Sequence, residues 1–155
     1  MAGSSPRRVY VRSVNIEAHD ARTRFEQSPS ATLGTVDAAG QPHLVPVTFT
    51  LSGDDHVYIA IDDKPKRTKG LKRLQNIAAN PRVSLLVNEY ADDWEQLWWV
   101  RADGTAAVAE FSELPAGLLA AFQERYPWYV ANPPAGPVID ISVTKWSGWA
   151  FASYL

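Results

Sequence analysis

Apolar and polar side chains alternate along several short segments of this chain, and each such segment predicts a β-strand. In the clearest case, Val45, Val47, Phe49 and Leu51 would share one face of a strand. Turn-forming residues such as Gly40 separate these segments, so neighbouring strands are expected to pair as antiparallel hairpins. The predicted strands cover residues 31–36, 43–51, 57–61, 83–87, 96–109 and 138–154.

Helical patterns are fewer than strand patterns. Residues 17–27 predict a short helix, and residues 112–125 predict a second one with Ser112 as its N-cap. Many short strands with few inserted helices favour a mainly β, antiparallel Greek-key barrel with peripheral helices. The length of 155 residues fits one domain, expected over residues 17–155 after a flexible N-terminal arm at residues 1–16.

Composition excludes several classes of protein. The net charge of −2 argues against a dedicated nucleic-acid-binding protein, and no apolar run approaches the roughly 20 residues of a membrane-spanning helix. The chain has no cysteine, which excludes thiol catalysis, iron–sulfur clusters and disulfides. The absence of cysteine and of a secretory signal pattern favours a cytoplasmic location, with neither nucleic acid nor membrane as a partner.

One stretch between two predicted strands, residues 62–82, is unusually basic. Six cations and no acid occur over residues 64–73, after which a helical pattern continues until an Asn-Pro pair ends it. Lys66, Lys69 and Arg73 line up near the amino end of that helix, where free N–H groups and the helix dipole favour an anion. The pattern predicts a phosphate-bearing ligand at the helix entrance, and a solvated charged face is the competing interpretation.

Three tryptophans depart from a simple strand pattern. Trp98 and Trp99 are adjacent, so a strand points them to opposite faces, and both faces then need apolar cover. Trp146 breaks the alternation that the last predicted strand keeps up to Val143, so either a bulge shifts the register or another molecule covers this side chain. Together they predict a homodimer interface on the outer wall of the barrel, with core packing as the alternative.

The motifs of several common enzyme classes are absent from the sequence. There is no G-x-G-x-x-G, no P-loop and no G-x-S-x-G, which argues against Rossmann, Walker-type and α/β-hydrolase chemistry. His19, His43 and His56 lack metal-ligand spacing, so no metal site is expected. An enzyme of this composition would depend on a bound cofactor for its chemistry.

Four segments, in order, resemble a known family. They are A-T-L-G-T-V-D-A-A-G-Q-P-H-L-V-P-V-T-F from Ala31, L-x-N-I-A-A-N-P-R-V-S-L-L-V from Leu74, V-R-A-D-G-T-A from Val100 and K-W-S-G-W from Lys145. The sequence resembles the pyridoxamine 5′-phosphate oxidase-like split β-barrel family. Within that family it looks like the actinobacterial subgroup of coenzyme F420-dependent oxidoreductases.

The resemblance implies a six-stranded FMN-binding split barrel that acts as a homodimer, with flavin or deazaflavin sites at the interface. Cations around the helix after the third strand would bind the cofactor phosphate, and Arg73 takes the place of the family's usual lysine. The segment over residues 62–73 is longer than usual, which leaves the role of each cation open. The implied cofactor-binding residues are Pro46, Val47, Thr48, Lys64, Lys66, Lys69, Lys72, Arg73, Trp94 and Trp146.

The resemblance also implies an activity, namely hydride transfer from reduced coenzyme F420 to a planar unsaturated small molecule. Coenzyme F420 carries a polyanionic tail beyond its phosphate, which would use the surplus of cations. The alternatives are an FMN-dependent oxidoreductase on the same fold and a non-catalytic carrier of flavin or deazaflavin. The sequence identifies neither the catalytic residues nor the acceptor.

Overall fold

The strands of the protein form one antiparallel sheet in the computed structural model, which describes Gly3, residues 11–61 and residues 69–153. The strands are β1 (Val11–Asn15), β2 (Ala31–Val36), β3 (Pro42–Val47), β4 (Thr50–Leu51), β5 (His56–Ala60), β6 (Arg82–Glu89), β7 (Trp98–Ala109) and β8 (Val138–Ser153). The helices are α1 (Ala18–Gln27), α2 (Lys69–Ala79), α3 (Leu118–Arg125) and α4 (Trp128–Ala131), with 3-10 turns η1 (Trp94–Gln96) and η2 (Phe111–Glu113).

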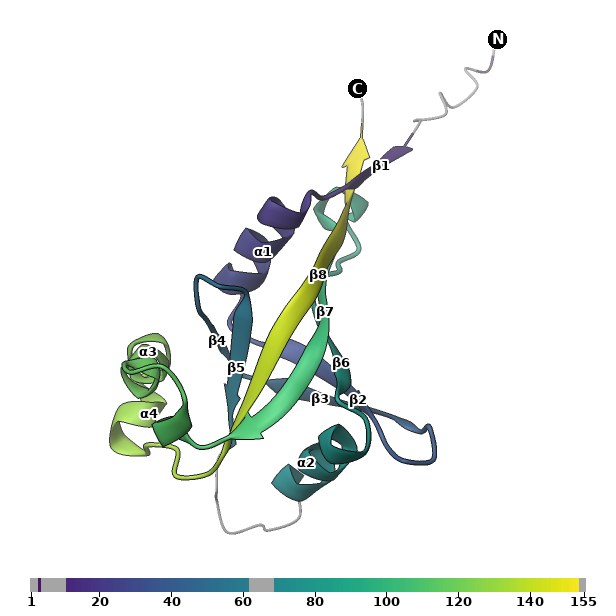
Figure 1. Ribbon diagram of the computed structural model, residues 1–155. Helices are drawn as coiled ribbons and strands as arrows, with labels where there is room; N and C mark the ends of the chain where they lie inside the picture. The colour runs from purple at the N-terminus through teal and green to yellow at the C-terminus, as the bar shows by residue number, and fades with distance from the viewer. Residues whose placement is uncertain (1–2, 4–10, 62–68, 154–155) are drawn as a thin grey trace.

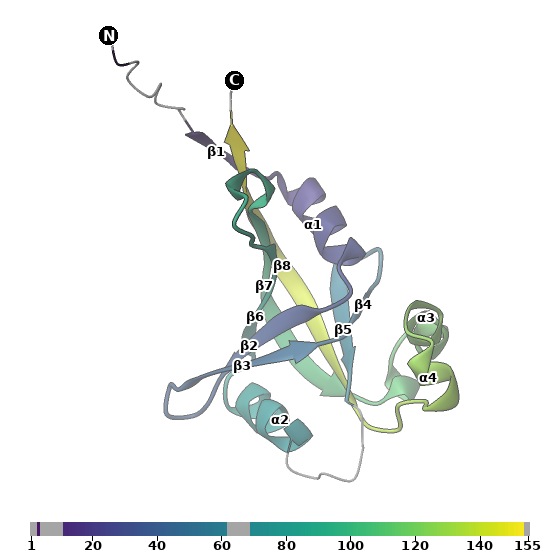
Figure 2. The same ribbon diagram turned by 180° about the vertical axis from the view of Figure 1, so that it is seen from behind.

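The sheet is curled around the long strand β8, which pairs with β7, β5 and β1 (Figure 1). The strand order is β3-β2-β6-β7-β8-β5-β4, so the two edges, β3 and β4, are consecutive in sequence. Helix α1 lies near one end of the curled sheet, α2 lies at the other, and α3 and α4 lie on its flank (Figures 1 and 2). This architecture confirms a mainly β fold with peripheral helices, consistent with a split barrel.

The expected strand count of six is wrong, because the described residues form eight strands. The segment predicted as one strand over residues 43–51 is divided into β3 and β4, with Thr48 and Phe49 between them. The other added strand is β1, in the segment expected to be a flexible arm. The backbone of Val11–Asn15 pairs with residues 149–153 at the end of β8. The pairing of β8 with β7 ends at Ala150, so the last residues of β8 extend past β7.

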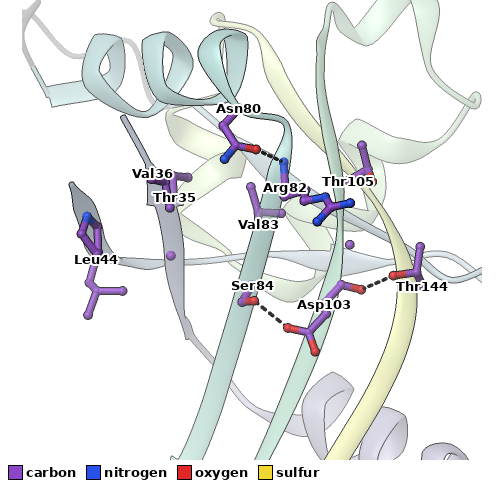
Figure 3. A pocket seen from close by; sticks show the side chains of 13 residues that line it. Thr35, Val36, Leu44, Asn80, Arg82, Val83, Ser84, Asp103, Thr105 and Thr144 are labelled. Carbon is purple, nitrogen blue, oxygen red and sulfur yellow. Dashed lines mark hydrogen bonds between the residues drawn. The ribbon is translucent and has the colours of Figure 1, made fainter. Parts of the chain in front are cut away.

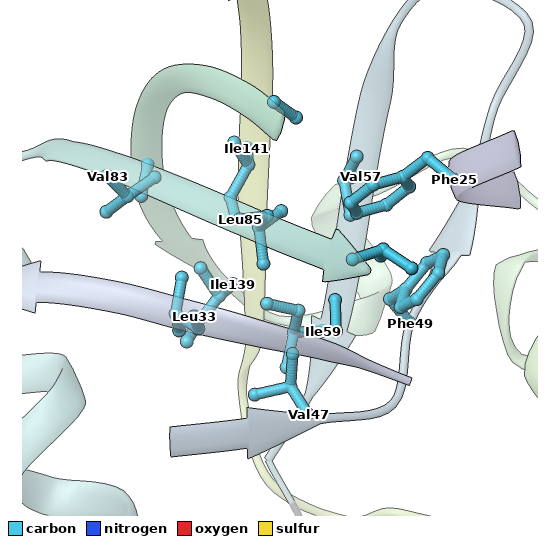
Figure 4. Close-up of a cluster of buried hydrophobic side chains, with 14 of the residues drawn as sticks. Phe25, Leu33, Val47, Phe49, Val57, Ile59, Val83, Leu85, Ile139 and Ile141 are labelled. Atoms are coloured by element: carbon cyan, nitrogen blue, oxygen red, sulfur yellow. The ribbon is translucent and has the colours of Figure 1, made fainter. Parts of the chain in front are cut away.

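The core fills the inside of the curl with side chains from both halves of the sheet (Figure 4). Phe25 of α1 packs against Phe49, with ring centroids 4.6 Å apart, so the helix covers one end of the core. A second cluster joins the outer side of β5 and β8 to α3 and α4, and includes Tyr58, Phe122 and Tyr129. Both clusters involve the short segment between β3 and β4, because Phe49 belongs to the first and Thr48 contacts Tyr129 of the second.

A bulge explains the position of Trp146. The β7–β8 register shifts between Asp103 and Gly104, which pair with Lys145 and Val143, so Thr144 has no opposite residue. Beyond this shift, Trp146 turns to the core side and its ring lies edge-on against Phe25. The bulge alternative is therefore confirmed.

The helix expected over residues 112–125 begins later than predicted. Residues 111–113 form only a 3-10 turn, and α3 starts at Leu118 after Gly117, whose φ is +90°. Pro115 and this left-handed glycine interrupt the backbone, so Ser112 cannot cap a continuous helix. Within residues 11–61 and 69–153, no helix has both the length and the apolar character needed to span a bilayer.

Candidate functional site

The amino-terminal half of α2 faces the β2–β3 hairpin through an ion pair between Lys72 and Asp37. Lys72 Nζ lies 3.6 Å from Asp37 Oδ2, while Asp37 also accepts backbone N–H groups of the hairpin. The pKa of Asp37 is lowered, chiefly by the hydrogen bond from the Gln41 N–H, with a further contribution from Lys72. One predicted phosphate ligand, Lys72, is therefore already paired with a carboxylate.

A buried hydrogen bond holds α2 against the sheet one turn further along. The Asn76 side chain is 1% exposed and its Nδ2 donates to Thr35 Oγ1 at 3.0 Å. Because both groups are removed from water, each depends on the other for a partner. This bond fixes the rotation of α2 and thereby the direction of Arg73, three residues earlier.

Replacing Asn76 by alanine is expected to destabilise the protein by about 1–3 kcal/mol, because the Thr35 hydroxyl would remain buried without its donor. Chemical denaturation measures this loss. The exposed neighbour Gln75 provides the matched control, and Gln75→Ala should leave the free energy of unfolding nearly unchanged. Equal effects of the two substitutions would contradict the anchoring role of Asn76.

Arg73 is the cation that the structure singles out. Its Nε atom is buried and has no hydrogen-bond partner among the described residues. Burial lowers the pKa of Arg73, because removing a guanidinium from water disfavours its charged form. An anion beside Arg73 would offset that effect, so a phosphate group of a cofactor fits this position.

His43 on β3 also has a buried side-chain nitrogen atom. Its Nδ1 atom is buried and lacks a partner within the described part of the chain, and His43 pairs across β2–β3 with Thr35. Thr35 is also the acceptor for Asn76, which lies three residues after Arg73, so the strand register relates His43 to the same region of α2. Sequence reasoning did not assign His43 to this region, because only the β2–β3 register relates it to α2.

The ring-contact candidates on β3 differ in their surroundings. Pro46 is exposed, Val47 is buried in the core, and Thr48 is half-buried beyond the end of the strand. The Thr48 hydroxyl lies 2.8 Å from the hydroxyl of Tyr129 on α4. Pro46 and Thr48 are the members of this trio with side-chain surface available to a ligand.

The remaining predicted residues do not gather at α2. Trp94 is 64% exposed on η1 and contacts Phe151 near the end of β8, at the opposite end of the molecule from α2 (Figures 1 and 2). Trp146 lies against Phe25, and its Nε1 donates to Asp55 at 3.3 Å. Within one chain, neither tryptophan joins Arg73. Lys64 and Lys66 fall outside the described residues, and for Lys69 only the backbone at the start of α2 is described.

A groove of about 640 Å³ crosses β2, β3, β6 and β7 beside the bulge (Figure 3). Ser84 Oγ donates to Asp103 Oδ1 at 2.6 Å on its floor, and Arg82 extends along it. None of the predicted cofactor-binding residues lines this groove. The partnerless atoms of Arg73 and His43 are the stronger indication of a ligand, because a groove with satisfied polar groups does not require one.

A histidine–carboxylate pair lies on the outer side of β5 and β8. His56 Nδ1 is 2.6 Å from Asp140 Oδ1, and the His56 ring stacks on Tyr58 at 5.9 Å. The hydrogen bond to Asp140 raises the pKa of His56, opposed by burial and supported by the charges of Asp54 and Asp55. The sequence did not predict this pair, because His56 and Asp140 lie far apart in the chain and belong to no motif.

The His56–Asp140 pair predicts a pH-dependent stability. Because the folded-state pKa of His56 lies above its ordinary value of 6.5, the stabilisation is complete below pH 6.5 and is lost as the pH rises through the folded pKa. His56→Gln should remove on the order of 1 kcal/mol at low pH and flatten this dependence. Urea denaturation between pH 5.5 and 8.5 measures both effects, and an unchanged pH profile would contradict the role of the pair.

The comparisons with known proteins identify the family. A model of the pyridoxamine 5′-phosphate oxidase family matches residues 18–150. The chain belongs to this family. No curated protein sequence matches the chain.

Solved structures with a similar fold extend the similarity to nearly the whole chain. A FAD-binding protein from Mesorhizobium loti is 20% identical with a TM-score of 0.66, over 92% of this chain and 99% of the other. The FAD-binding protein of Mycobacterium smegmatis is 14% identical with a TM-score of 0.58, over 91% and 100%. The heme storage protein HutZ of Vibrio cholerae is 19% identical with a TM-score of 0.59, over 90% and 92%. At these sequence identities the similarity establishes a shared fold. The names of these three proteins refer to different bound molecules, FAD and heme.

Proposed function

We propose that the protein is an oxidoreductase that binds a phosphate-bearing flavin-type cofactor at the α2 end of the barrel. The observation that carries this proposal is the buried Nε of Arg73, which has no hydrogen-bond partner in the described part of the chain, three residues before the Asn76 that anchors α2 to Thr35. A guanidinium offers two parallel N–H groups to phosphate oxygens, and desolvation strengthens such a contact. Solved relatives that are named as FAD-binding proteins support a flavin as the cargo.

The edge of the sheet supplies a place for the ring of the cofactor. Strand β3 is an edge strand of the sheet, with Pro46 exposed on it and Thr48 half-buried just beyond its end. The protein's own residues would bind and orient the cofactor and exclude water from one face of it. The cofactor, once bound, would supply the hydride or electron transfer.

Coenzyme F420 is the second candidate, and the basic residues of the segment 64–73 favour it. An oligoanionic tail would occupy cations that a single phosphate leaves free. The pairing of Lys72 with Asp37 reduces that surplus by one, so we place FMN first among the phosphate-bearing cofactors and coenzyme F420 second. Relative affinity for the two molecules decides between them.

We also propose that a second copy of the chain covers the outer face of β2, β3, β6 and β7. This face exposes Leu44 to 70%, Leu86 to 38% and, beside them, Tyr90 to 60%. Arg101 lies over the ring of Trp99 on the same face, with its guanidinium carbon 5.6 Å from the ring centroid. Exposed apolar residues that share one sheet face favour an interface.

Leu44→Glu is expected to convert the homodimer to a monomer, because a carboxylate at the centre of an apolar interface would have no partner. Sedimentation velocity measures the change in mass. Val130 on α4 is similarly exposed, at 64%, but lies on a different face, so Val130→Glu is the matched control. A wild-type monomer, or equal effects of both substitutions, would contradict this interface.

Turnover separates an oxidoreductase from a carrier. The protein would be loaded with FMN, reduced photochemically under argon and mixed with a panel of quinones and nitroaromatic compounds as electron acceptors. Reoxidation of the bound flavin faster than that of free FMN, with saturation in the acceptor, supports the proposed activity. Tight binding without faster reoxidation by any acceptor, for either FMN or coenzyme F420, would establish a carrier instead.

A further inference from the structure

Two tyrosine hydroxyls from the flank of the barrel bond to the short segment between β3 and β4. The Tyr126 hydroxyl accepts a hydrogen bond from Phe49 N at 3.1 Å, and it lies 2.9 Å from Pro29 O and 3.1 Å from Phe49 O. The Tyr129 hydroxyl lies 2.8 Å from Thr48 Oγ1. Both tyrosines therefore reach from the α3–α4 region to residues 48–49.

The segment at residues 48–49 depends on these contacts for its position. Strand β3 ends at Val47 and β4 begins at Thr50, so the two residues between them lie outside the sheet ladder. The Phe49 N–H donates to the Tyr126 hydroxyl in place of a neighbouring strand, and the single proton of that hydroxyl is within reach of the carbonyl oxygens of Phe49 and Pro29. The two hydroxyls thus act as a fixed support for the edge of the barrel that the proposed cofactor ring would occupy.

The tyrosine rings and hydroxyls have separable roles. The Tyr129 ring packs edge-on against Phe122 at 5.9 Å and against Tyr126 at 5.8 Å, so most of its packing is retained in a phenylalanine. A serine or threonine hydroxyl and a tyrosine hydroxyl each carry one proton, and the Thr48–Tyr129 contact uses one of the two. The second O–H has no other partner among the described residues, so the pair retains one donor.

We infer that Tyr129 is a positioning residue for cofactor binding, which holds the Thr48 hydroxyl so that this hydroxyl pair donates one hydrogen bond to a carbonyl oxygen of the bound ring. The inference rests on the proposed function, because it assigns Tyr129 in the α3–α4 region a role within the same cofactor site. Flavins and deazaflavins both carry ring carbonyl groups, so the chemistry applies to either candidate. Tyr126 supports the same edge through the backbone of Phe49.

The test compares Tyr129→Phe, Thr48→Val and the double variant with the wild-type protein, using FMN and coenzyme F420 as probes. Ring-fluorescence titration gives the Kd, the visible absorption band of the bound ring reports hydrogen bonding to it, and thermal unfolding of the unloaded protein reports the structural effect. Tyr58→Phe is the matched control, because Tyr58 is buried in the same cluster but its hydroxyl interacts with Ser52 and not with Thr48.

Tyr129→Phe and Thr48→Val are each expected to weaken binding by roughly three- to tenfold and to shift the absorption band, which is the scale of one neutral hydrogen bond. The double variant should bind no more weakly than the weaker single variant, because Tyr129 is proposed to act through Thr48 and both substitutions therefore interrupt the same hydrogen bond to the ring. Tyr58→Phe should leave both the Kd and the band unchanged.

Two results would overturn the inference in distinguishable ways. Wild-type affinity and an unshifted band in both Tyr129→Phe and Thr48→Val, with wild-type binding intact, would contradict the positioning role and leave the proposed function standing. Failure of the wild-type protein to bind either probe would overturn both. Thr48→Val keeps the test decisive if Tyr129→Phe lowers the unfolding temperature, because Thr48 lies outside helices α3 and α4.

Discussion

Replacing Arg73 by alanine is expected to weaken FMN binding by tenfold to a hundredfold while the protein stays folded. A charge-assisted contact to phosphate contributes about 1.5–3 kcal/mol, and the buried position of the Arg73 Nε places it at the upper part of that range. Fluorescence titration and thermal unfolding of the same samples measure both quantities.

Arg82→Ala is the matched control for Arg73→Ala. Arg82 is an exposed arginine on β6 that lines the groove, and it is not one of the cations predicted to bind phosphate. We expect its replacement to leave the Kd for FMN within about twofold of the wild-type value, as is usual for a surface substitution. A large loss of affinity in Arg82→Ala with none in Arg73→Ala would move the cofactor site to the groove.

Gly104→Ala is expected to be the most destabilising single methyl addition in the described sheet, at about 2–4 kcal/mol. A Cβ atom at this position would overlap the backbone carbonyl oxygen of Ser142, and it would lie 3.1 Å from Cγ2 of Ile141. Because the obstacle is backbone of the paired strand, relief requires β7 and β8 to separate at the bulge. Urea denaturation measures the free energy of unfolding.

Gly53→Ala provides the comparison. Gly53 lies in the turn between β4 and β5, and no atom lies within 4 Å of the position that its Cβ would occupy. The expected change in stability is within about 0.5 kcal/mol. Similar losses in both variants would contradict the steric conflict expected from the close approach of β7 and β8 at Gly104.

Much of the fold follows from alternation, because a strand with one buried face must place its apolar residues at every second position. The pattern predicted β2 and β6 and nearly the full length of β8. It also detected the register change near Trp146, since one extra residue in β8 moves all later side chains to the other face. Local sequence therefore carried the information for these elements.

Tertiary contacts decided the elements that were missed. Alternation from Val45 to Leu51 predicted one strand, but Tyr126 and Tyr129 withdraw Thr48 and Phe49 from the ladder. The sequence carries no signal for such contacts, because the two tyrosines lie about 80 residues away from Thr48 and Phe49 in the chain. Strand β1 likewise depends on a partner, the end of β8, at the opposite end of the chain.

The candidate site was predictable in part. Arg73 was predicted from its position in a basic helix. Its buried Nε, which has no partner among the described residues, is consistent with the proposed ligand-binding role. Charge counting could not show that Lys72 already faces Asp37, since that contact requires the β2–β3 hairpin to fold back toward α2. It also could not relate His43 to the same region, because the two lie on different elements.

Parallel titrations of the wild-type protein with FMN and coenzyme F420, at low and high salt, test the central claim most directly. The account predicts saturable, micromolar binding of at least one of the two, with affinity that falls as salt screens the phosphate contact. Tighter binding of FMN would establish the flavin, and tighter binding of coenzyme F420 would establish the deazaflavin. Binding of neither molecule at either salt concentration would contradict a cofactor site at Arg73.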